Sequence, residues 1–134
     1  TPAATRLASH YDQVVFFNTQ TSTFNSIQVK NVYNYSDAKA KENIQSLSQS
    51  LSILKLLRPV SYNFTDNSDN TKFRKGGDGK EIGLLAQEVE QVLPNIVLTD
   101  PDGNKLINYT SLIAVLIDAV KDLNEKVSAL EAQQ

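Results

Sequence analysis

The chain has 134 residues, of which 40% are hydrophobic and 21% charged, and its formal net charge is −2. This length suits one compact domain with extensions, and the lack of a basic surplus argues against a nucleic-acid partner. With no cysteine and one histidine, disulfides and zinc sites of the usual kinds are excluded, and no apolar run is long enough to span a membrane. We expect no metal, no cofactor and no nucleic-acid or membrane partner.

The N-terminal part is rich in β-branched and aromatic residues. Residues 13–33, QVVFFNTQTSTFNSIQVKNVY, mix Val, Ile, Thr and Phe with short polar breaks, which predicts two or three short strands. Such a small ribbon cannot bury a core by itself. It should therefore pair with the rest of the chain or with copies of itself.

The apolar spacing becomes helical from Ile44 onward. Ile44, Leu47, Leu51 and Leu54 step by three or four residues, which predicts an amphipathic helix that ends at Arg58-Pro59. Four shorter elements should follow. They are a strand in VSYNF at 60–64, a solvated loop at 66–80, a short helix in EIGLLAQEVEQVLP ending at Pro94, and a hairpin around Pro101-Asp102-Gly103.

The C-terminal part carries a heptad pattern. Its apolar positions step by 4, 3, 4, 3, 4 and 3 residues and are Tyr109, Ile113, Leu116, Val120, Leu123, Val127 and Leu130. We call these seven residues the heptad seam, with Ile113, Val120 and Val127 at a. Lys126 at g and Glu131 at the next e suit the interchain pairing of a parallel coiled coil. The alternative is a single amphipathic helix packed on its own domain.

Two roles are open for Ser36, which lies where the strand-like pattern gives way to the helical one. Ser36 or Asp37 could accept a backbone N–H at the start of the helix running toward Leu57. Ser36 could instead be a nucleophile with a neutral lysine as its base. Ser36 and Lys41 are five residues apart, which separates them by about 140° on a helix, so contact between them would require a turn.

Four segments in order resemble one known family. SDAKAKENI, LLRPVSYNF, GLLAQEVEQVLPNIV and DGNKLINYTSLIAVLIDAVKDLNEKVSALE together run from Ser36 to about Leu130. They are similar to the C-terminal intramolecular chaperone domain of phage tailspikes and tail fibres, the peptidase S74 or endosialidase chaperone family. The location implied is a phage virion tail or a bacterial cell surface.

The resemblance implies an α+β fold of short strands and helices, ending in a long helix that forms a trimeric coiled coil at about residues 109–131. Residues 1–35 would be a β-rich stub of the parent fibre and residues 36–134 the chaperone domain. β-Branched residues at a with Leu at d favour two strands, but Ile117 at e and Ala119 at g widen the apolar face. We therefore expect a homotrimer. Its interface should comprise Ile113, Leu116, Val120, Leu123, Val127 and Leu130.

The resemblance also implies that the module helps an upstream fibre domain of the same chain to assemble and then releases itself by hydrolysis. By position the nucleophile is Ser36, the base is Lys41 and the scissile bond is Tyr35-Ser36. Asp37 belongs to the motif, and Lys39 is a supporting cation. Two other functions remain open. The chain could be a trimerisation module that never cuts, or a self-cleaving regulatory protein that frees its N-terminal part.

Overall fold

The computed structural model describes residues 5–65 and 80–134, so the loop predicted at 66–80 lies almost wholly outside the described residues. The described part is a mixed fold of short antiparallel strand pairs and three α-helices. Residues 5–37, 64 and 65 fall in one compact unit, and residues 38–63 and 80–134 fall in a second. No helix in the described ranges is long and apolar enough to cross a membrane.

The first unit contains one minimal β-hairpin. Strand β1 (Phe17–Asn18) pairs antiparallel with β2 (Thr23–Phe24), and the rings of Phe17 and Phe24 meet edge to face with their centroids 6.0 Å apart. The Asn18 side chain shapes the turn, since its Oδ1 accepts the backbone N–H groups of Gln20 and Thr21. The predicted strands in residues 13–33 are thus confirmed only for this hairpin.

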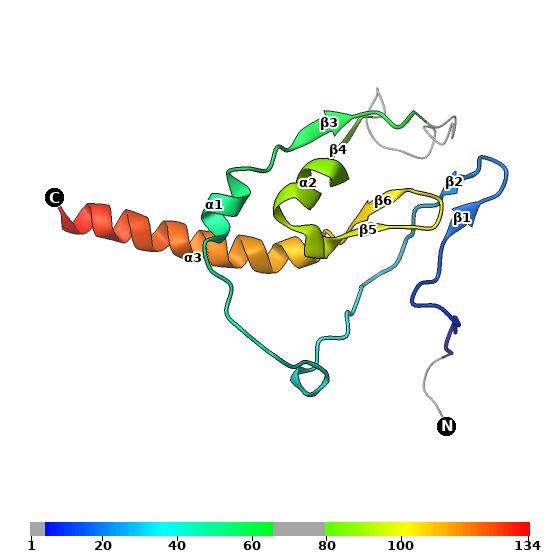
Figure 1. Ribbon diagram of the computed structural model, residues 1–134, viewed down its shortest axis with the longest axis horizontal. Coiled ribbons are helices and arrows are strands. Elements are labelled where there is room, and N and C mark those ends of the chain that lie inside the picture. The colour runs from blue at the N-terminus through cyan, green and yellow to red at the C-terminus, as the bar shows by residue number, and fades with distance from the viewer. Residues whose placement is uncertain (1–4, 66–79) are drawn as a thin grey trace. The chain divides into compact units, whose positions relative to one another are not determined.

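The second unit holds the remaining elements, coloured from cyan to red in Figure 1. A 3-10 turn η1 (Ala38–Ala40) precedes helix α1 (Ser50–Leu54) and strand β3 (Val60–Tyr62). Strand β4 (Glu81–Gly83), helix α2 (Ala86–Val92) and the 3-10 turn η3 (Pro94–Ile96) come next. Strands β5 (Val97–Thr99) and β6 (Lys105–Ile107) lead into the long helix α3 (Ser111–Ala132).

The helix predicted from Ile44 to Arg58 is confirmed only for Ser50–Leu54 and is wrong at both ends. Helix α1 begins only at Ser50, because Gln49 has a left-handed backbone with φ of 60° and breaks the helical ladder there. No side-chain hydrogen bond from Gln49 caps the helix. The Asp118 carboxylate of helix α3 instead faces its first turn, with Oδ2 3.4 Å from the Ser50 nitrogen. This position is decided by packing against a distant helix.

The short helix predicted from Glu81 is also wrong for its first residues. Glu81–Gly83 form strand β4, which pairs antiparallel with β3 so that Val60 opposes Gly83. Helix α2 follows and ends before Pro94, as predicted. Strand pairing therefore overrides the local pattern at the start of this segment.

The predicted hairpin around Pro101-Asp102-Gly103 is confirmed. Strands β5 and β6 pair antiparallel with Val97 opposite Ile107. Asp100 closes the turn, because its Oδ1 accepts the backbone N–H groups of Asp102 at 3.0 Å and of Asn104 at 2.8 Å. Gly103 has φ of 85°, a conformation that favours glycine.

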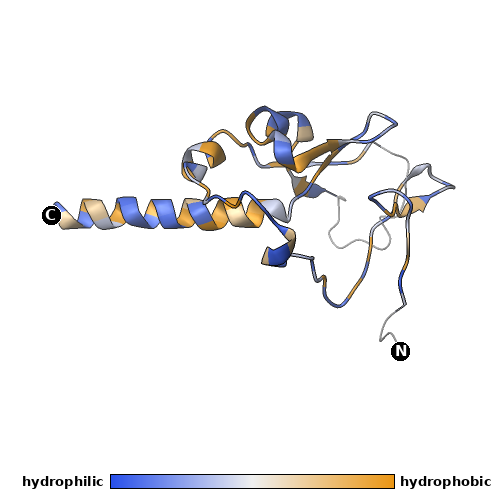
Figure 2. Ribbon diagram, turned by 60° about the horizontal axis from the view of Figure 1, so that its bottom comes forward, coloured by the Kyte–Doolittle hydropathy of each residue, from blue (hydrophilic) through white to orange (hydrophobic). Residues whose placement is uncertain are grey.

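Helix α3 packs on α1 through one side. Val115 and Ala119 are buried at 6% and 2% exposure, and Ser50 of α1 is buried at 1%. Val89 of α2 is the other fully buried hydrophobic residue among those described. Figure 2 shows hydrophobic residues alternating with hydrophilic ones along the whole of α3. The helix therefore has more apolar surface than its own chain covers.

Tyr109 joins the base of helix α3 to strand β4. Its hydroxyl accepts the Leu84 N–H at 2.9 Å and donates to the Leu84 carbonyl at 3.3 Å. A Cβ on Gly83 would lie only 2.8 Å from this hydroxyl, so glycine is needed for the close approach. Tyr109 was predicted as the first residue of the heptad seam, but it precedes α3 and its hydroxyl is engaged within the chain.

We expect Tyr109→Phe to lower the free energy of unfolding by about 1 kcal/mol, because the Leu84 backbone groups lose their shared partner. Urea unfolding followed by circular dichroism measures this change. Tyr33→Phe is the control, since Tyr33 is 90% exposed. Equal losses in the two variants would contradict the role of the Tyr109 hydroxyl.

We also expect acid to weaken the link between the Arg58 and Glu88 side chains. Arg58 donates to both Glu88 oxygens, at 2.7 and 3.3 Å, and this hydrogen bonding is the main cause that lowers the pKa of Glu88 below 4.5. The pKa of Glu88 is lower in the folded chain than in the unfolded chain. The pair therefore stabilises the fold at pH values above the unfolded pKa, and this stabilisation is lost as the pH falls through the folded pKa. Glu88→Gln should therefore lose less stability than wild type between about pH 5 and pH 3.

Thermal unfolding across that pH range measures this difference. Glu125→Gln, which removes an exposed carboxylate from helix α3, serves as the control and should follow the wild type. The same acid sensitivity in Glu88→Gln and wild type would contradict the expected contribution of the pair.

Candidate functional site

The predicted cleavage motif straddles the boundary between the two units. Tyr35, Ser36 and Asp37 end the first unit, whereas Lys39 and Lys41 begin the second. Ser36 and Lys41 therefore belong to different units, although they are only five residues apart in the sequence.

The backbone turns between the two predicted reactive residues. Lys39 lies in η1, and the Lys41 N–H donates to the Ala38 carbonyl at 3.0 Å. Contact between Ser36 and Lys41 was expected to require a turn, and a turn is present at this place. No α-helix of the described chain begins at Ser36 or Asp37, so the expected helix that either residue would cap is absent there.

The motif and its flanks are solvent-exposed in the single chain. Every residue from 31 to 49 is exposed, and Tyr35 before the predicted scissile bond is 79% exposed. An exposed lysine is kept protonated by water, whereas burial favours the neutral form that can accept a proton. The single chain therefore does not supply the desolvated surroundings that a lysine base requires.

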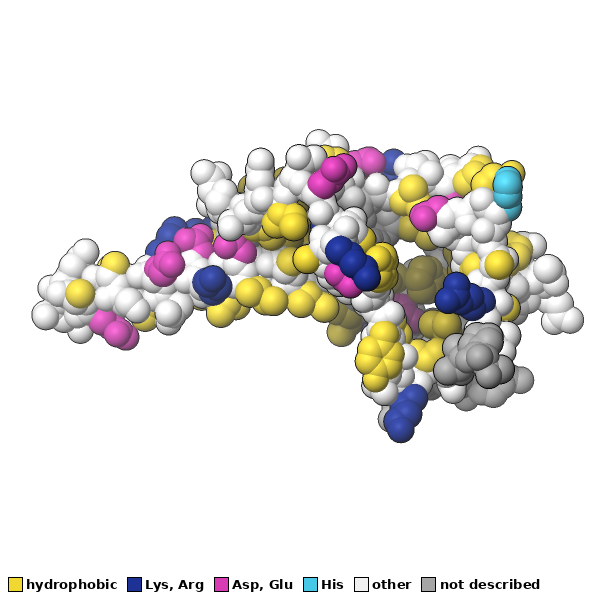
Figure 3. All heavy atoms as spheres, turned by 90° about the horizontal axis from the view of Figure 1, so that it is seen from below, with side chains coloured by type: hydrophobic (Ala, Val, Ile, Leu, Met, Phe, Trp, Pro, Cys, Tyr) yellow, Lys and Arg dark blue, Asp and Glu magenta, His cyan; other side chains and the backbone are white. Residues whose placement is uncertain are grey.

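The heptad seam is exposed along its whole length. Its residues are 44–64% exposed, whereas Val115 and Ala119 on the adjacent face of α3 are buried. The seven exposed residues are Tyr109, Ile113, Leu116, Val120, Leu123, Val127 and Leu130. The single chain therefore leaves the seam exposed, although α3 packs on α1 of its own domain through its other apolar face. Figure 3 shows hydrophobic side chains gathered in a row along α3.

Two charged residues lie beside the heptad seam, and no metal site is found among the described residues of the motif. Lys126 and Glu131, predicted to pair between chains, are both exposed on α3. Within the two described ranges, no three His, Asp or Glu side chains gather in a way that could hold a metal ion. The side chains of Ser36, Asp37, Lys39 and Lys41 supply hydroxyl, carboxylate and amine groups to the motif.

The sequence reasoning missed two residues that position helix α3. Asp118 faces the start of α1, and Tyr109 holds Leu84. The signal for Asp118 was its position between Val115 and Ala119, where a carboxylate interrupts an otherwise apolar face. No sequence pattern indicated the hydrogen bonds of the Tyr109 hydroxyl, because their partner is the backbone of Leu84.

Comparison with known proteins gives a family and several relatives. A family described as chaperone of endosialidase, peptidase S74, matches residues 36–98. Long tail fibre protein Gp37 of Enterobacteria phage K3 is 32% identical over 124 residues, as is Gp37 of Enterobacteria phage T2, and each match covers 88% of this chain. Gp37 of Escherichia phage AR1 is 31% identical over 108 residues, or 77% of this chain. The chain spans only 9% of the length of these relatives.

Proposed function

The chain belongs to the endosialidase chaperone family, and we propose that it assists the assembly of a phage tail fibre. The observation that carries this proposal is the family match, which begins at Ser36, the residue expected to become a new N-terminus. The similarity to phage long tail fibre proteins supports it. In this proposal residues 1–35 are a β-rich stub of the fibre and residues 36–134 are the chaperone domain.

Three copies associate through the heptad seam of helix α3. The exposure of all seven seam residues supports this, because a soluble single chain rarely leaves so regular an apolar row uncovered. Burying Leu116, Leu123 and Leu130 would each contribute roughly 1.5–3 kcal/mol. The exposed Ile117 beside the seam favours three copies over two, since it widens the apolar face.

Assembly through helix α3 would help a β-rich fibre to align its three chains. Three identical chains must pair their strands in register, and such non-local pairing is slow and prone to slip. A coiled coil raises the effective concentration of each chain for the others. The exposed apolar residues of the first unit are the kind of surface that such pairing would cover. They include Val14, Val15, Phe16, Ile27, Val29 and Val32.

Once assembled, the module cuts the bond between Tyr35 and Ser36. The Ser36 hydroxyl attacks the Tyr35 carbonyl carbon while the neutral Lys41 amine takes the hydroxyl proton. The C–N bond breaks, Lys41 passes that proton to the departing Ser36 nitrogen, and an ester joins Tyr35 to the Ser36 oxygen. Water then hydrolyses the ester. The products are a chain that ends in the Tyr35 carboxylate and a chain that begins with Ser36, which carries its hydroxyl and a free amino group.

Cutting depends on assembly in this proposal. The proposed reactive residues are exposed in the single chain, so other copies must supply the burial. Asp37 and Lys39 support the site by their charge. Loss of the tether after folding makes unfolding of the fibre irreversible, so the lifetime of the fibre is then set by its unfolding rate.

Two alternatives are separated by simple measurements. A trimerisation module that never cuts would keep its full mass as a folded trimer. A self-cleaving regulatory protein would cut in the same way but carry a different upstream domain, which the sequence preceding this segment in its parent protein would identify.

We expect Leu123→Asp to convert the trimer into monomers, because three carboxylates would meet in the centre of the seam. Light scattering measures the molar mass. Ser128→Asp is the control, since it places the same charge at an outward-facing b position of α3. A trimeric Leu123→Asp variant would show that the seam is not the assembly element.

We expect Ser36→Ala and Lys41→Ala each to abolish cutting while leaving the trimer intact. Lys39→Ala should reduce cutting less, because Lys39 supports the site without exchanging the proton. Intact mass after purification and incubation measures the extent of cutting. A wild-type trimer that keeps its full mass would refute self-cleavage and leave the non-cutting module as the function.

A further inference from the structure

The segment between η1 and α1 has helical spacing without helical structure. Ile44 and Leu47 continue the pattern of Leu51 and Leu54, which are half-buried in helix α1, the helix that packs on α3. Yet Ile44 is 72% and Leu47 51% exposed, and residues 44–49 form no regular element. Residues 44–49 therefore have the apolar spacing of an amphipathic helix but are not helical in the single chain.

The backbone at both ends of this segment is unusual. Asn43 and Gln49 have left-handed conformations, with φ of 55° and 60°. Such a conformation is unfavourable for residues with a Cβ and is less readily adopted by Gln than by Asn. A change of Gln49 to the helical region would let α1 continue backward. The long Asp118 contact to the Ser50 nitrogen, at 3.4 Å, would then be given up.

A backward extension of α1 would lengthen this helix beyond its start at Ser50. Six residues, 44–49, add about 9 Å along the helix axis. In Figure 1 the chain leaves α1 past α3 and continues away from it toward η1. Figure 3, which is viewed from that side, shows the row of hydrophobic side chains along α3.

A second copy offers a surface for these two side chains. Ile117 lies beside the seam and is 58% exposed, on the part of α3 that packs against α1. A coiled coil formed by the a and d residues would leave this e position at its margin. Each copy thus has an exposed apolar residue, Ile117, beside its seam and two more on the uncovered segment that precedes α1.

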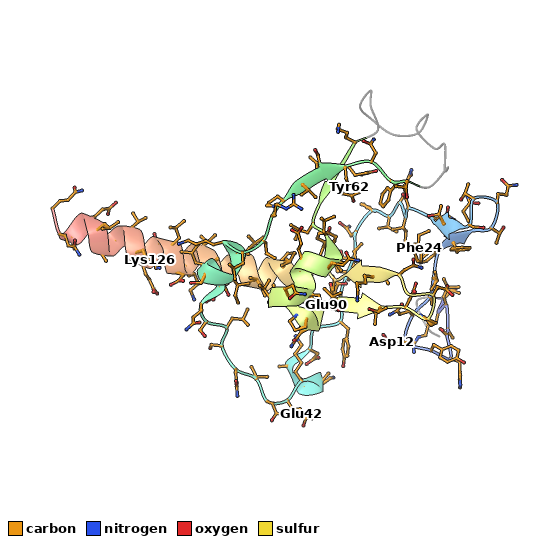
Figure 4. The ribbon with its side chains drawn as sticks, turned by 45° about the horizontal axis from the view of Figure 1, so that its top comes forward. Asp12, Phe24, Glu42, Tyr62, Glu90 and Lys126 are labelled. Atoms are coloured by element: carbon orange, nitrogen blue, oxygen red, sulfur yellow. The ribbon has the colours of Figure 1, made fainter. Side chains whose placement is uncertain are left out.

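We propose that Ile44 and Leu47 of one copy pack against Ile117 and the adjoining seam of a second copy, as a backward extension of helix α1. This inference rests on the proposed assembly through the heptad seam. Ile44 lies three residues after Lys41, so docking the segment draws η1 and Lys41 to the interface between copies. Figure 4 shows Glu42 beside η1 on the same loop. Ile44 and Leu47 are positioning residues that couple assembly to cutting.

Hydrogen exchange tests the contact without relying on cutting. We expect the amides of residues 44–49 to exchange at least tenfold more slowly in the wild-type trimer than in the monomeric Leu123→Asp variant. Substituting Ile117→Ser should remove this protection while the trimer persists. Equal exchange of residues 44–49 in the trimer and the monomer would overturn the proposal, whether or not the chain cuts itself.

A double variant, Ile44→Ser with Leu47→Ser, tests the coupling. It should remain trimeric, lose the protection at 44–49 and cut at least tenfold more slowly. Leu56→Ser is the matched control, because Leu56 is 68% exposed and lies beyond the other end of α1, and it should behave as wild type. If the double variant folds with wild-type circular dichroism but is monomeric, the segment still contacts a second copy.

The two proposals fail in different ways. A wild-type trimer that protects residues 44–49 but never cuts would refute self-cleavage and leave the contact standing. A double variant that keeps wild-type protection and wild-type cutting would refute the contact and leave self-cleavage standing.

Discussion

Helix α3 has two apolar faces, and its own chain covers only one of them. Val115 and Ala119 pack toward α1 and are buried, whereas the heptad seam remains exposed. The covered face fixes α1 on the helix, and Tyr109 at the base of α3 holds the end of strand β4. Among the described residues, no element buries the heptad seam. The arrangement of the second unit and the proposed association of copies therefore both depend on the surface of one helix.

The exposure of the motif explains how assembly could control the proposed reaction. Ser36 belongs to one unit and Lys41 to the other, and the surrounding residues are exposed. In the proposed reaction, other copies would supply the burial that the single chain lacks. A chaperone that must remain attached until its client is folded needs this dependence.

Some features of the fold could be read from short stretches of sequence. The turn at Pro101-Asp102-Gly103 was predictable because Asp100 and Gly103 act on their immediate neighbours. The long C-terminal helix was predictable because its apolar residues repeat at a fixed period. The start of α1 was not, because Gln49 adopts a left-handed backbone and because Ser50 contacts Asp118, which lies 68 residues away.

The sequence by itself determined the heptad seam, the β5–β6 hairpin and the family motif at Ser36, because each depends on residues that are close together in the chain. Only the tertiary structure decided that Glu81–Gly83 form a strand, since residues 63–80 separate it in the sequence from its partner β3. It also decided that Leu47 is exposed while Leu51 is half-buried. Periodicity shows that a face is apolar, but which faces the chain covers depends on packing between distant elements.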